Sequence, residues 1–232
     1  MAMLTVKTIR STDQSRVIWP PAAQQILRRS SIEDLASERV FVNKGRHLTI
    51  EGLDASSIFF QLTGWTSVEC VSRRGERVLM DFLLPGDFAG MDDQGPHASF
   101  TVTALTDVAA LKIERAQFFA MVERDPALAQ IYTDALMTAL QRTRSRRLAL
   151  SAKTGAAKVC EVLSELATRA EKSVREAPTP RLPITQVSLA SAVGLTPVAV
   201  NRIVQTLRRA GVLDWTATGV RILDARRLQE FD

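Results

Sequence analysis

The stretch QVSLASAVGLTPVAVNRIVQTL, residues 186–207, constrains the fold more than any other part of the chain. Gly194 can adopt the positive φ that a tight turn requires, and the small side chain of Ala190 permits two helices to approach closely. We expect Thr196 to cap the second helix and Pro197 to begin it. The stretch therefore predicts a helix-turn-helix, whose buried inner faces comprise Leu189, Val193, Leu195, Val200 and Ile203.

The solvent face of the second predicted helix carries side chains suited to nucleic acid. Arg202 can present two parallel donors to guanine, Asn201 can pair with adenine, and Val198 can meet a thymine methyl group. These three residues are the predicted base contacts. The predicted phosphate contacts, which position the protein without reading sequence, are Thr185, Thr196, Gln205, Arg208, Arg209 and Arg221. Any helical hairpin with a glycine turn fits the same template, so a helix pair without a DNA role is the alternative.

The segment after this helix pair predicts a wing. VLDWTATGVRIL, residues 212–223, alternates in the manner of two short strands around a turn near Thr218 and Gly219. A hairpin beside a helix-turn-helix adds a second element that can face a duplex.

Glycines divide the first half of the chain into short alternating apolar segments. Between Gly45 and about Ile113 no stretch has a helical period, and this pattern predicts a small all-β roll or barrel. A mainly helical half follows. The dividing glycines are Gly52, Gly64, Gly75, Gly86 and Gly90.

Residues 126–150 predict one long helix with an apolar stripe at spacings of three and four. The stripe can pack against the chain's own β-roll, or against the same helix of a second copy. We favour the second arrangement because Ala135 and Ala139 are small enough for close approach. The predicted dimer interface comprises Leu128, Ile131, Tyr132, Ala135, Leu136 and Ala139.

Four arginines follow that stripe, and such a run is usually a solvated face. The alternative is that they hold a hinge or contact the duplex backbone. They are Arg142, Arg144, Arg146 and Arg147.

This order of elements resembles the Crp/Fnr family of bacterial transcription regulators. LTGWTSVECVSRRGERVLMDFLLPGDFAG looks like the core of the family's β-roll, with LPGDFAG leading into its effector pocket. The resemblance implies an α+β fold with a jelly-roll-like sensor domain over residues 1–125, a dimerisation helix over 126–150 and a winged helix-turn-helix over 151–232. It also implies three partners: double-stranded DNA, a second copy of the chain, and RNA polymerase. A dimer would place two recognition helices about 34 Å apart on a near-palindromic operator.

The resemblance assigns an effector pocket to Gly86, Asp87, Phe88, Gly90, Met91 and Ser99. In the cyclic-AMP-binding relatives, a glutamate after this glycine motif holds the ribose and a later arginine neutralises the phosphate. Met91 stands in the glutamate's place, and Ala98 or Ser99 stands in the arginine's place. Asp92 and Asp93 would repel a phosphate. We therefore expect a regulator that does not depend on cyclic AMP, with a rearranged nucleotide site as the alternative. The sequence leaves three modes of control open: an unknown small-molecule effector, thiol chemistry, or DNA binding without any effector.

The recognition helix departs from the best-known relatives in one place. Arg202 matches the family's base-contacting arginine, whereas Val198 stands where those relatives carry a glutamate that accepts from cytosine. We therefore expect a different half-site.

Neither metal nor cofactor is expected. An iron–sulfur cluster needs about four thiolates, and relatives that carry one place most of them near the amino terminus, where this chain has no cysteine before Cys70. His97 lies in a loop with glycine and proline and is expected to be a solvent-exposed histidine rather than a haem ligand. Cys160 falls on an apolar helical face, which predicts a buried inert thiol, with a redox switch as the alternative.

The charge balance and the lengths of the apolar runs limit the classes of function that the chain can have. The chain has 30 Lys and Arg against 25 Asp and Glu, and this basic balance suits a polyanionic partner, although it would also suit a membrane surface. No apolar run approaches the roughly 20 residues that cross a bilayer, and two cysteines suit a reducing compartment, so we expect a cytoplasmic protein. Nothing in the sequence indicates catalysis. The alternative to a DNA-binding regulator is a β-roll module that acts on a protein partner.

Overall fold

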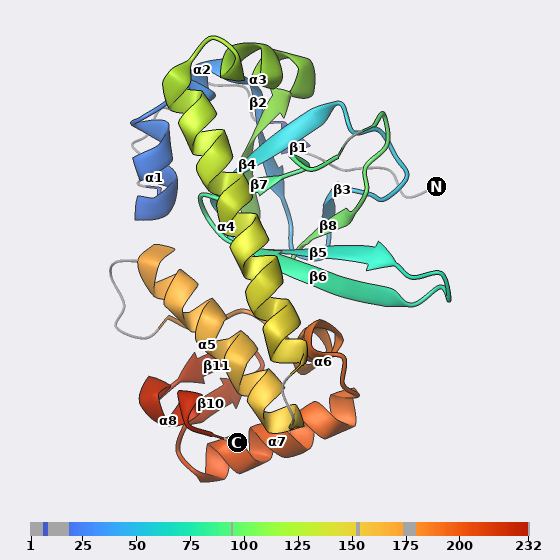
Figure 1. Ribbon diagram of the computed structural model, residues 1–232, viewed down its shortest axis with the longest axis vertical. Helices are drawn as coiled ribbons and strands as arrows, with labels where there is room; N and C mark the ends of the chain where they lie inside the picture. Colours follow the sequence, from blue (N-terminus) through green and yellow to red (C-terminus); the bar gives the residue numbers. More distant parts are fainter. Residues whose placement is uncertain (1–6, 9–18, 94, 152–153, 174–179, 232) are drawn as a thin grey trace.

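The computed structural model describes residues 7–8, 19–93, 95–151, 154–173 and 180–231. A β-rich amino-terminal half is crossed by the long helix α4 (Pro126–Leu150), which leads into a mainly helical carboxyl-terminal half (Figure 1). The predicted α+β fold, with a β-roll before a long helix and a winged helix-turn-helix, is confirmed.

Two antiparallel sheets form the β-roll. The first has the strand order β1-β2-β9-β4-β7 and the second has the order β3-β8-β5-β6. The strand bounds are β1 Lys7–Thr8, β2 Ala36–Val42, β3 His47–Thr49, β4 Ser57–Thr63, β5 Thr66–Val71, β6 Arg77–Leu83, β7 Phe88–Ala89, β8 Thr101–Ala104 and β9 Val108–Glu114.

The alternation of strand β4 divides the core of the roll. Phe59 packs between the sheets with Leu83 and Val102, whereas Phe60 packs on the opposite face, towards the helices. This two-residue period is what a strand buried on both faces requires. The tight turn after β4 needs Gly64, because a Cβ there would lie 2.3 Å from the carbonyl oxygen of Asp107.

Helices cover the outer face of the first sheet (Figure 1). Asp125 caps α4, since its carboxylate accepts from the backbone N–H groups of Ala127 and Leu128, and Pro126 takes the first helical position. The three preceding helices are α1 Pro21–Leu27, α2 Ile32–Leu35 and α3 Arg115–Val122.

The carboxyl-terminal half contains the predicted helix-turn-helix and wing. No single helix in the described ranges is long and apolar enough to span a membrane, and the one helix pair that reaches that length and composition together, α6 with α7, is bent by 109°. The elements are α5 Gly155–Ser173, α6 Gln186–Val193, α7 Pro197–Arg209, β10 Leu213–Thr216, β11 Gly219–Ile222 and α8 Ala225–Gln229.

One hydrophobic cluster joins the two halves. Trp65, Leu79 and Phe82 of the β-roll pack with buried side chains of α5 and α6. The backbone N–H of Leu79 on edge strand β6 also donates to Ser191 Oγ of α6, at 3.0 Å. The β-roll and the helix-turn-helix are therefore packed directly on one another.

Candidate nucleic-acid interface and effector cavity

The turn between α6 and α7 has the geometry that its residues predict. Gly194 ends α6 with φ of 66°, in the left-handed region, and Thr196 Oγ1 accepts from the N–H of Ala199 at 3.2 Å. Pro197 takes the first helical position of α7. A capping box between Thr185 and Ser188 begins α6. Both helices are thus fixed at their ends.

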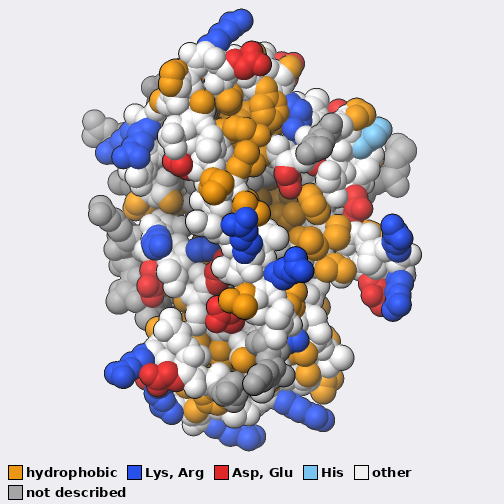
Figure 2. All heavy atoms as spheres, in the orientation of Figure 1, with side chains coloured by type: hydrophobic (Ala, Val, Ile, Leu, Met, Phe, Trp, Pro, Cys, Tyr) orange, Lys and Arg blue, Asp and Glu red, His pale blue; other side chains and the backbone are white. Residues whose placement is uncertain are grey.

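The outward face of α7 carries the predicted base contacts. Val198 is 63% exposed, and Asn201 and Arg202 are also exposed. Figure 2 shows Lys and Arg side chains along the lower edge of the molecule, where α7 lies. Val200 and Val204 on the opposite face are fully buried. The core therefore holds this helix rigidly while its polar face stays open.

One contact on this face was missed by the sequence reasoning. The Asn201 side-chain amide donates to Gln186 Oε1 at 2.9 Å, which ties the recognition helix to the start of α6. The amide keeps its Oδ1 and a second N–H for adenine, because an asparagine side chain has two donors and an acceptor. No sequence spacing signals a bond across 15 positions.

The predicted phosphate contacts lie around this face. Arg208 and Arg209 are exposed in the last turn of α7, and Arg221 is exposed on β11. Gln205 is half-buried. Thr185 and Thr196 are exposed, and each uses its hydroxyl as a helix cap. These positions suit contacts with the phosphate backbone of DNA. The hydroxyl groups of Thr185 and Thr196, however, already accept hydrogen bonds from backbone N–H groups of α6 and α7.

The predicted wing is a two-stranded hairpin with Ala217 and Thr218 at its turn, one residue earlier than expected. Leu182 forms two backbone hydrogen bonds with Val220 and so adds a third short strand segment. Gly219 permits this approach, since a Cβ there would lie 2.1 Å from the carbonyl oxygen of Leu182. Arg181, not singled out in the sequence, braces the hairpin through Thr216 Oγ1 at 2.6 Å.

A cavity of about 550 Å³ lies between the β-roll, α4 and the end of α6. Four of the residues assigned to the predicted effector pocket, Asp87, Phe88, Gly90 and Met91, line it. Figure 2 shows hydrophobic side chains gathered in a hollow beside α4.

Two predicted pocket residues are absent from the lining. Gly86 instead packs under α1, where a Cβ would lie 3.3 Å from Ala22. Ser99 is exposed, and its N–H donates to Asp93 Oδ1 at 2.7 Å, because the loop after β7 folds back on itself. Gly86 and Ser99 were therefore wrong as lining residues.

The two aspartates after Met91 have different environments. Asp93 is 7% exposed and pairs with Arg115 at 3.3 Å, so its charge is compensated. Arg115 also donates to the carbonyl oxygens of Ala55, Gly90 and Asp93 and clamps the loop. Desolvation raises the pKa of the Asp92 carboxyl, which lines the cavity. Of the two aspartates, Asp92 is the one without an ion-pair partner in the described part of the chain.

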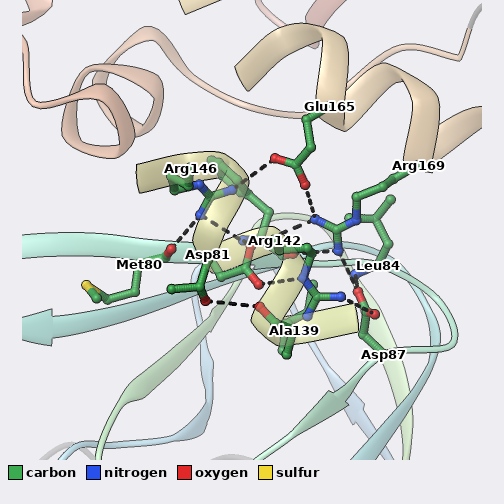
Figure 3. Close-up of polar contacts among 12 residues, drawn as sticks. Met80, Asp81, Leu84, Asp87, Ala139, Arg142, Arg146, Glu165 and Arg169 are labelled. Atoms are coloured by element: carbon green, nitrogen blue, oxygen red, sulfur yellow. Dashed lines mark hydrogen bonds and ion pairs between the residues drawn. The ribbon is translucent and has the colours of Figure 1, made fainter. Parts of the chain in front are cut away.

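A cluster of six charged side chains lies beside the cavity (Figure 3), and we call it the arginine–carboxylate network. Arg142 donates to Asp81 at 2.9 Å and to Asp87 at 3.1 Å. Arg169 donates to Asp87 at 2.7 Å. The network joins β6, the turn before β7, α4 and α5, and comprises Asp81, Asp87, Arg142, Arg146, Glu165 and Arg169.

The network corrects the prediction of a solvated arginine face. Arg142 and Arg146 are only 11% and 8% exposed, whereas Arg144 and Arg147 face solvent. Burial opposes the charge of Arg142, but Asp87 and Asp81 outweigh it and raise the pKa. The alternative interpretation, that these arginines hold a hinge, agrees with the position of Arg142 and Arg146.

The predicted dimer stripe also needs correction. Leu128 is fully buried within its own chain and is unavailable to a partner chain. Ile131, Tyr132 and Ala135 pack on the same core; Tyr132 lies edge-on to Phe118 at 5.8 Å. Only Leu128 of these four is fully buried; the other three are half-buried and also contact this core.

Other parts of α4 remain open to a partner. Leu136 is 37% exposed and Ala139 is half-buried, and both line the cavity. Met137 and Leu140 are 49% and 41% exposed.

Cys160 is a buried thiol, and His97 is an exposed loop histidine. Cys160 is 3% exposed, and burial raises its pKa to about 11, as an inert thiol requires. His97 is exposed in its loop, as expected. Within the described ranges, no group of three or more His, Cys, Asp or Glu side chains is arranged to hold a metal ion.

Comparisons with known proteins agree with this architecture. Residues 39–125 match the cyclic nucleotide-binding domain, and residues 157–231 match the Crp-like helix-turn-helix domain. The chain is 31% identical over 156 residues to the transcriptional activator protein FnrL of Cereibacter sphaeroides, covering 66% of this chain and 62% of FnrL, less than two thirds of that protein's length.

Two further relatives cover more of the chain. The nitrogen fixation regulation protein FixK of Bradyrhizobium diazoefficiens is 26% identical, over 82% of this chain and 80% of FixK. The structure of FixK2 from Bradyrhizobium japonicum superposes with a TM-score of 0.73 at 22% identity, covering 84% of this chain and 96% of FixK2. With both halves matched in the same order, the chain belongs to the Crp/Fnr family of transcription regulators.

Proposed function

We propose that this chain is a sequence-specific DNA-binding regulator that acts as a homodimer on a near-palindromic operator and does not require cyclic AMP. The observation that carries the proposal is α7. It is capped by Thr196, anchored through Val200 and Val204, and presents Asn201 and Arg202 to solvent. A rigid helix with donors on its open face suits the major groove.

The open part of α4 supports the homodimer. Leu136, Met137 and Leu140 expose 37%, 49% and 41% of their surface along one helix. Such an apolar stripe favours the same stripe of a second copy across a two-fold axis. A two-fold pair of α7 helices then fits half-sites about 34 Å apart. RNA polymerase is the further partner that this role implies.

The cavity supports independence from cyclic AMP. Met91 has no carboxylate for a ribose, and Ser99 lies outside the lining. The three arginines of the arginine–carboxylate network face three carboxylates, so that cluster has no surplus charge for a phosphate. Asp92 adds an acidic group to the same cavity.

The experiment is a selection of bound DNA from a random pool, followed by titration of the enriched site with and without cyclic AMP. We expect a near-palindromic site bound equally well in both titrations. Enrichment only with cyclic AMP would contradict the independence from nucleotide. No enrichment under either condition would favour the alternative, a module that acts on a protein partner.

Arg202→Ala tests the reading face directly. A bidentate contact to guanine is worth about 1–3 kcal/mol, so the variant should bind the selected site about 5- to 150-fold more weakly and keep its nonspecific binding. The matched control is Arg124→Ala, an exposed arginine just before α4. Helix α4 begins at the end of the molecule that lies far from α7 (Figure 1). An equal loss of affinity for all DNA sequences would show that Arg202 contacts only phosphate groups.

A further inference from the structure

The hydrogen bond between Asn201 and Gln186 joins the two helices of the helix-turn-helix beside the open face of α7. Asn201 Nδ2 donates to Gln186 Oε1 at 2.9 Å, across 15 positions of sequence. Gln186 is the first residue of α6, and Asn201 lies in the second turn of α7. Asn201 is exposed and Gln186 is half-buried, so the bond runs from the polar face of α7 to a more enclosed side chain.

Both side chains are attached to backbone that is held in place. The capping box of Thr185 and Ser188 fixes the first turn of α6 around Gln186. Leu189 of α6 and Val200 of α7 are fully buried in one hydrophobic cluster. Because the core and the cap already set the two helices, the bond mainly fixes the direction in which the Asn201 amide points.

Without such a bond, an exposed asparagine on a helix has several orientations. Two of the three χ1 wells are accessible in a helix and the amide has two orientations, which gives about four arrangements. Adenine recognition needs one arrangement, in which the amide oxygen accepts from N6 and an amide N–H donates to N7. An unrestrained Asn201 would therefore adopt that arrangement only about a quarter of the time.

The acceptor of Gln186 selects which end of the Asn201 amide turns towards α6. Oε1 can only accept, so it holds the amide nitrogen of Asn201 on that side. An amide nitrogen has two N–H groups, and one bond to Gln186 leaves the second N–H and Oδ1 for a base. One donor and one acceptor are the groups that adenine requires.

We infer that Gln186 is a positioning residue that orients Asn201 for adenine and so sets one base preference of the DNA half-site. Gln186 contacts no base in this arrangement and acts through Asn201. Affinity is reduced in proportion to the fraction of the binding-competent arrangement, so the bond raises the preference for adenine about fourfold. The inference rests on the proposed function, because it concerns how the same face reads DNA.

Base preferences of variants test the inference. Asn201→Ala first identifies the position of the selected site at which the preference for adenine disappears. Gln186→Met keeps the length of the side chain and removes its acceptor, and it should lower that preference about fourfold. The matched control is Gln117→Met, the same change at an exposed glutamine of α3. An unchanged preference in Gln186→Met would overturn the inference, as would an Asn201→Ala variant that loses no preference for adenine.

Gln186→Glu separates the acceptor from the rest of the side chain. A carboxylate accepts hydrogen bonds, so this variant still holds the Asn201 nitrogen and should keep the preference for adenine. Its negative charge should weaken binding to every DNA sequence, because it lies near the phosphates. A preference for adenine that falls as far in Gln186→Glu as in Gln186→Met would overturn the role of the acceptor.

A double-mutant cycle shows whether Gln186 acts through Asn201. In the Asn201→Ala background, Gln186→Met should leave the base preferences unchanged, since the side chain that it orients is gone. A further change in base preference in that background would show that Gln186 contacts a base itself and would overturn the inference.

A measurement on the DNA-free protein keeps the inference separate from the proposed function. We expect a nuclear Overhauser effect between the side-chain amide protons of Asn201 and the γ protons of Gln186. Absence of this effect would overturn the inference, whatever the protein does with DNA. A chain that shows the effect but selects no DNA would contradict the proposed function, and Gln186 would then serve only to join α6 to α7.

Discussion

Arg169 and Arg226 each pair with a glutamate four positions away in sequence, in very different surroundings. The Arg169–Glu165 distance is 3.1 Å and the Arg226–Glu230 distance is 3.3 Å. The first pair is 17% and 20% exposed, and the second is 88% and 64% exposed. Substituting each arginine by methionine therefore compares a buried ion pair with a solvated one at nearly constant geometry.

Arg169→Met removes more than one contact. Arg169 also donates to Asp87 at 2.7 Å and to the carbonyl oxygen of Phe82 at 2.9 Å. Loss of one partner from a buried pair costs about 3–5 kcal/mol, and the remaining solvent access of Asp87 and Glu165 places this case near the lower end. We expect the free energy of unfolding to fall by about 3 kcal/mol for Arg169→Met and by about 0.3–0.5 kcal/mol for Arg226→Met.

Urea unfolding followed by tryptophan fluorescence measures both changes. With an m value of about 3 kcal/mol/M, the midpoint should fall by about 1 M for Arg169→Met and by about 0.1 M for Arg226→Met. Equal midpoints for the two variants would show that the arginine–carboxylate network contributes no more than an exposed pair. That result would refute the claim that burial strengthens the Arg169 contacts.

Three shorter predictions test other parts of the molecule. Leu140→Glu places a charge on the exposed apolar stripe of α4, and sedimentation should show monomers where the unaltered chain forms dimers; a stable dimer would move the interface elsewhere. Thr196→Ala removes the cap of α7 and should lower the free energy of unfolding, measured by urea denaturation, by about 1 kcal/mol. An unchanged free energy of unfolding would show that the cap does not stabilise the protein. Because burial raises the pKa of Cys160 to about 11, very little thiolate exists at pH 8, and iodoacetamide should modify the half-buried Cys70 first; mass spectrometry showing faster modification of Cys160 would contradict this.

The helix-turn-helix was predictable from the sequence because the residues that determine it lie close together in the chain. A glycine in the left-handed region, a threonine cap and a proline at the first helical position all act within a few residues of the turn. The bounds of α4 were predictable for the same reason, since Asp125 and Pro126 begin it. The alternating segments between glycines predicted a β-roll, although not the order of its strands.

Contacts between distant residues explain the failures. The stripe of α4 shows that the helix buries one face, but Leu128 faces its own protomer because Phe118 of α3 packs there, and periodicity does not reveal this. The sequence predicted a solvent-exposed Arg142, because its partners Asp81 and Asp87 lie 61 and 55 positions earlier and no local pattern links them to it. Ser99 was placed by analogy of spacing, and the folded-back loop removes it from the cavity.

The hydrophobic cluster that joins the β-roll to α5 and α6 has a consequence for engineering. The two-part architecture suggests an experiment in which the helix-turn-helix half is joined, at the end of α4, to the β-roll of another protein. Here such a cut would strip Trp65, Leu79 and Phe82 of their packing and leave edge strand β6 open to aggregation. A working chimera of this protein would therefore have to repack this junction, because the helix-turn-helix shares its core with strands of the β-roll.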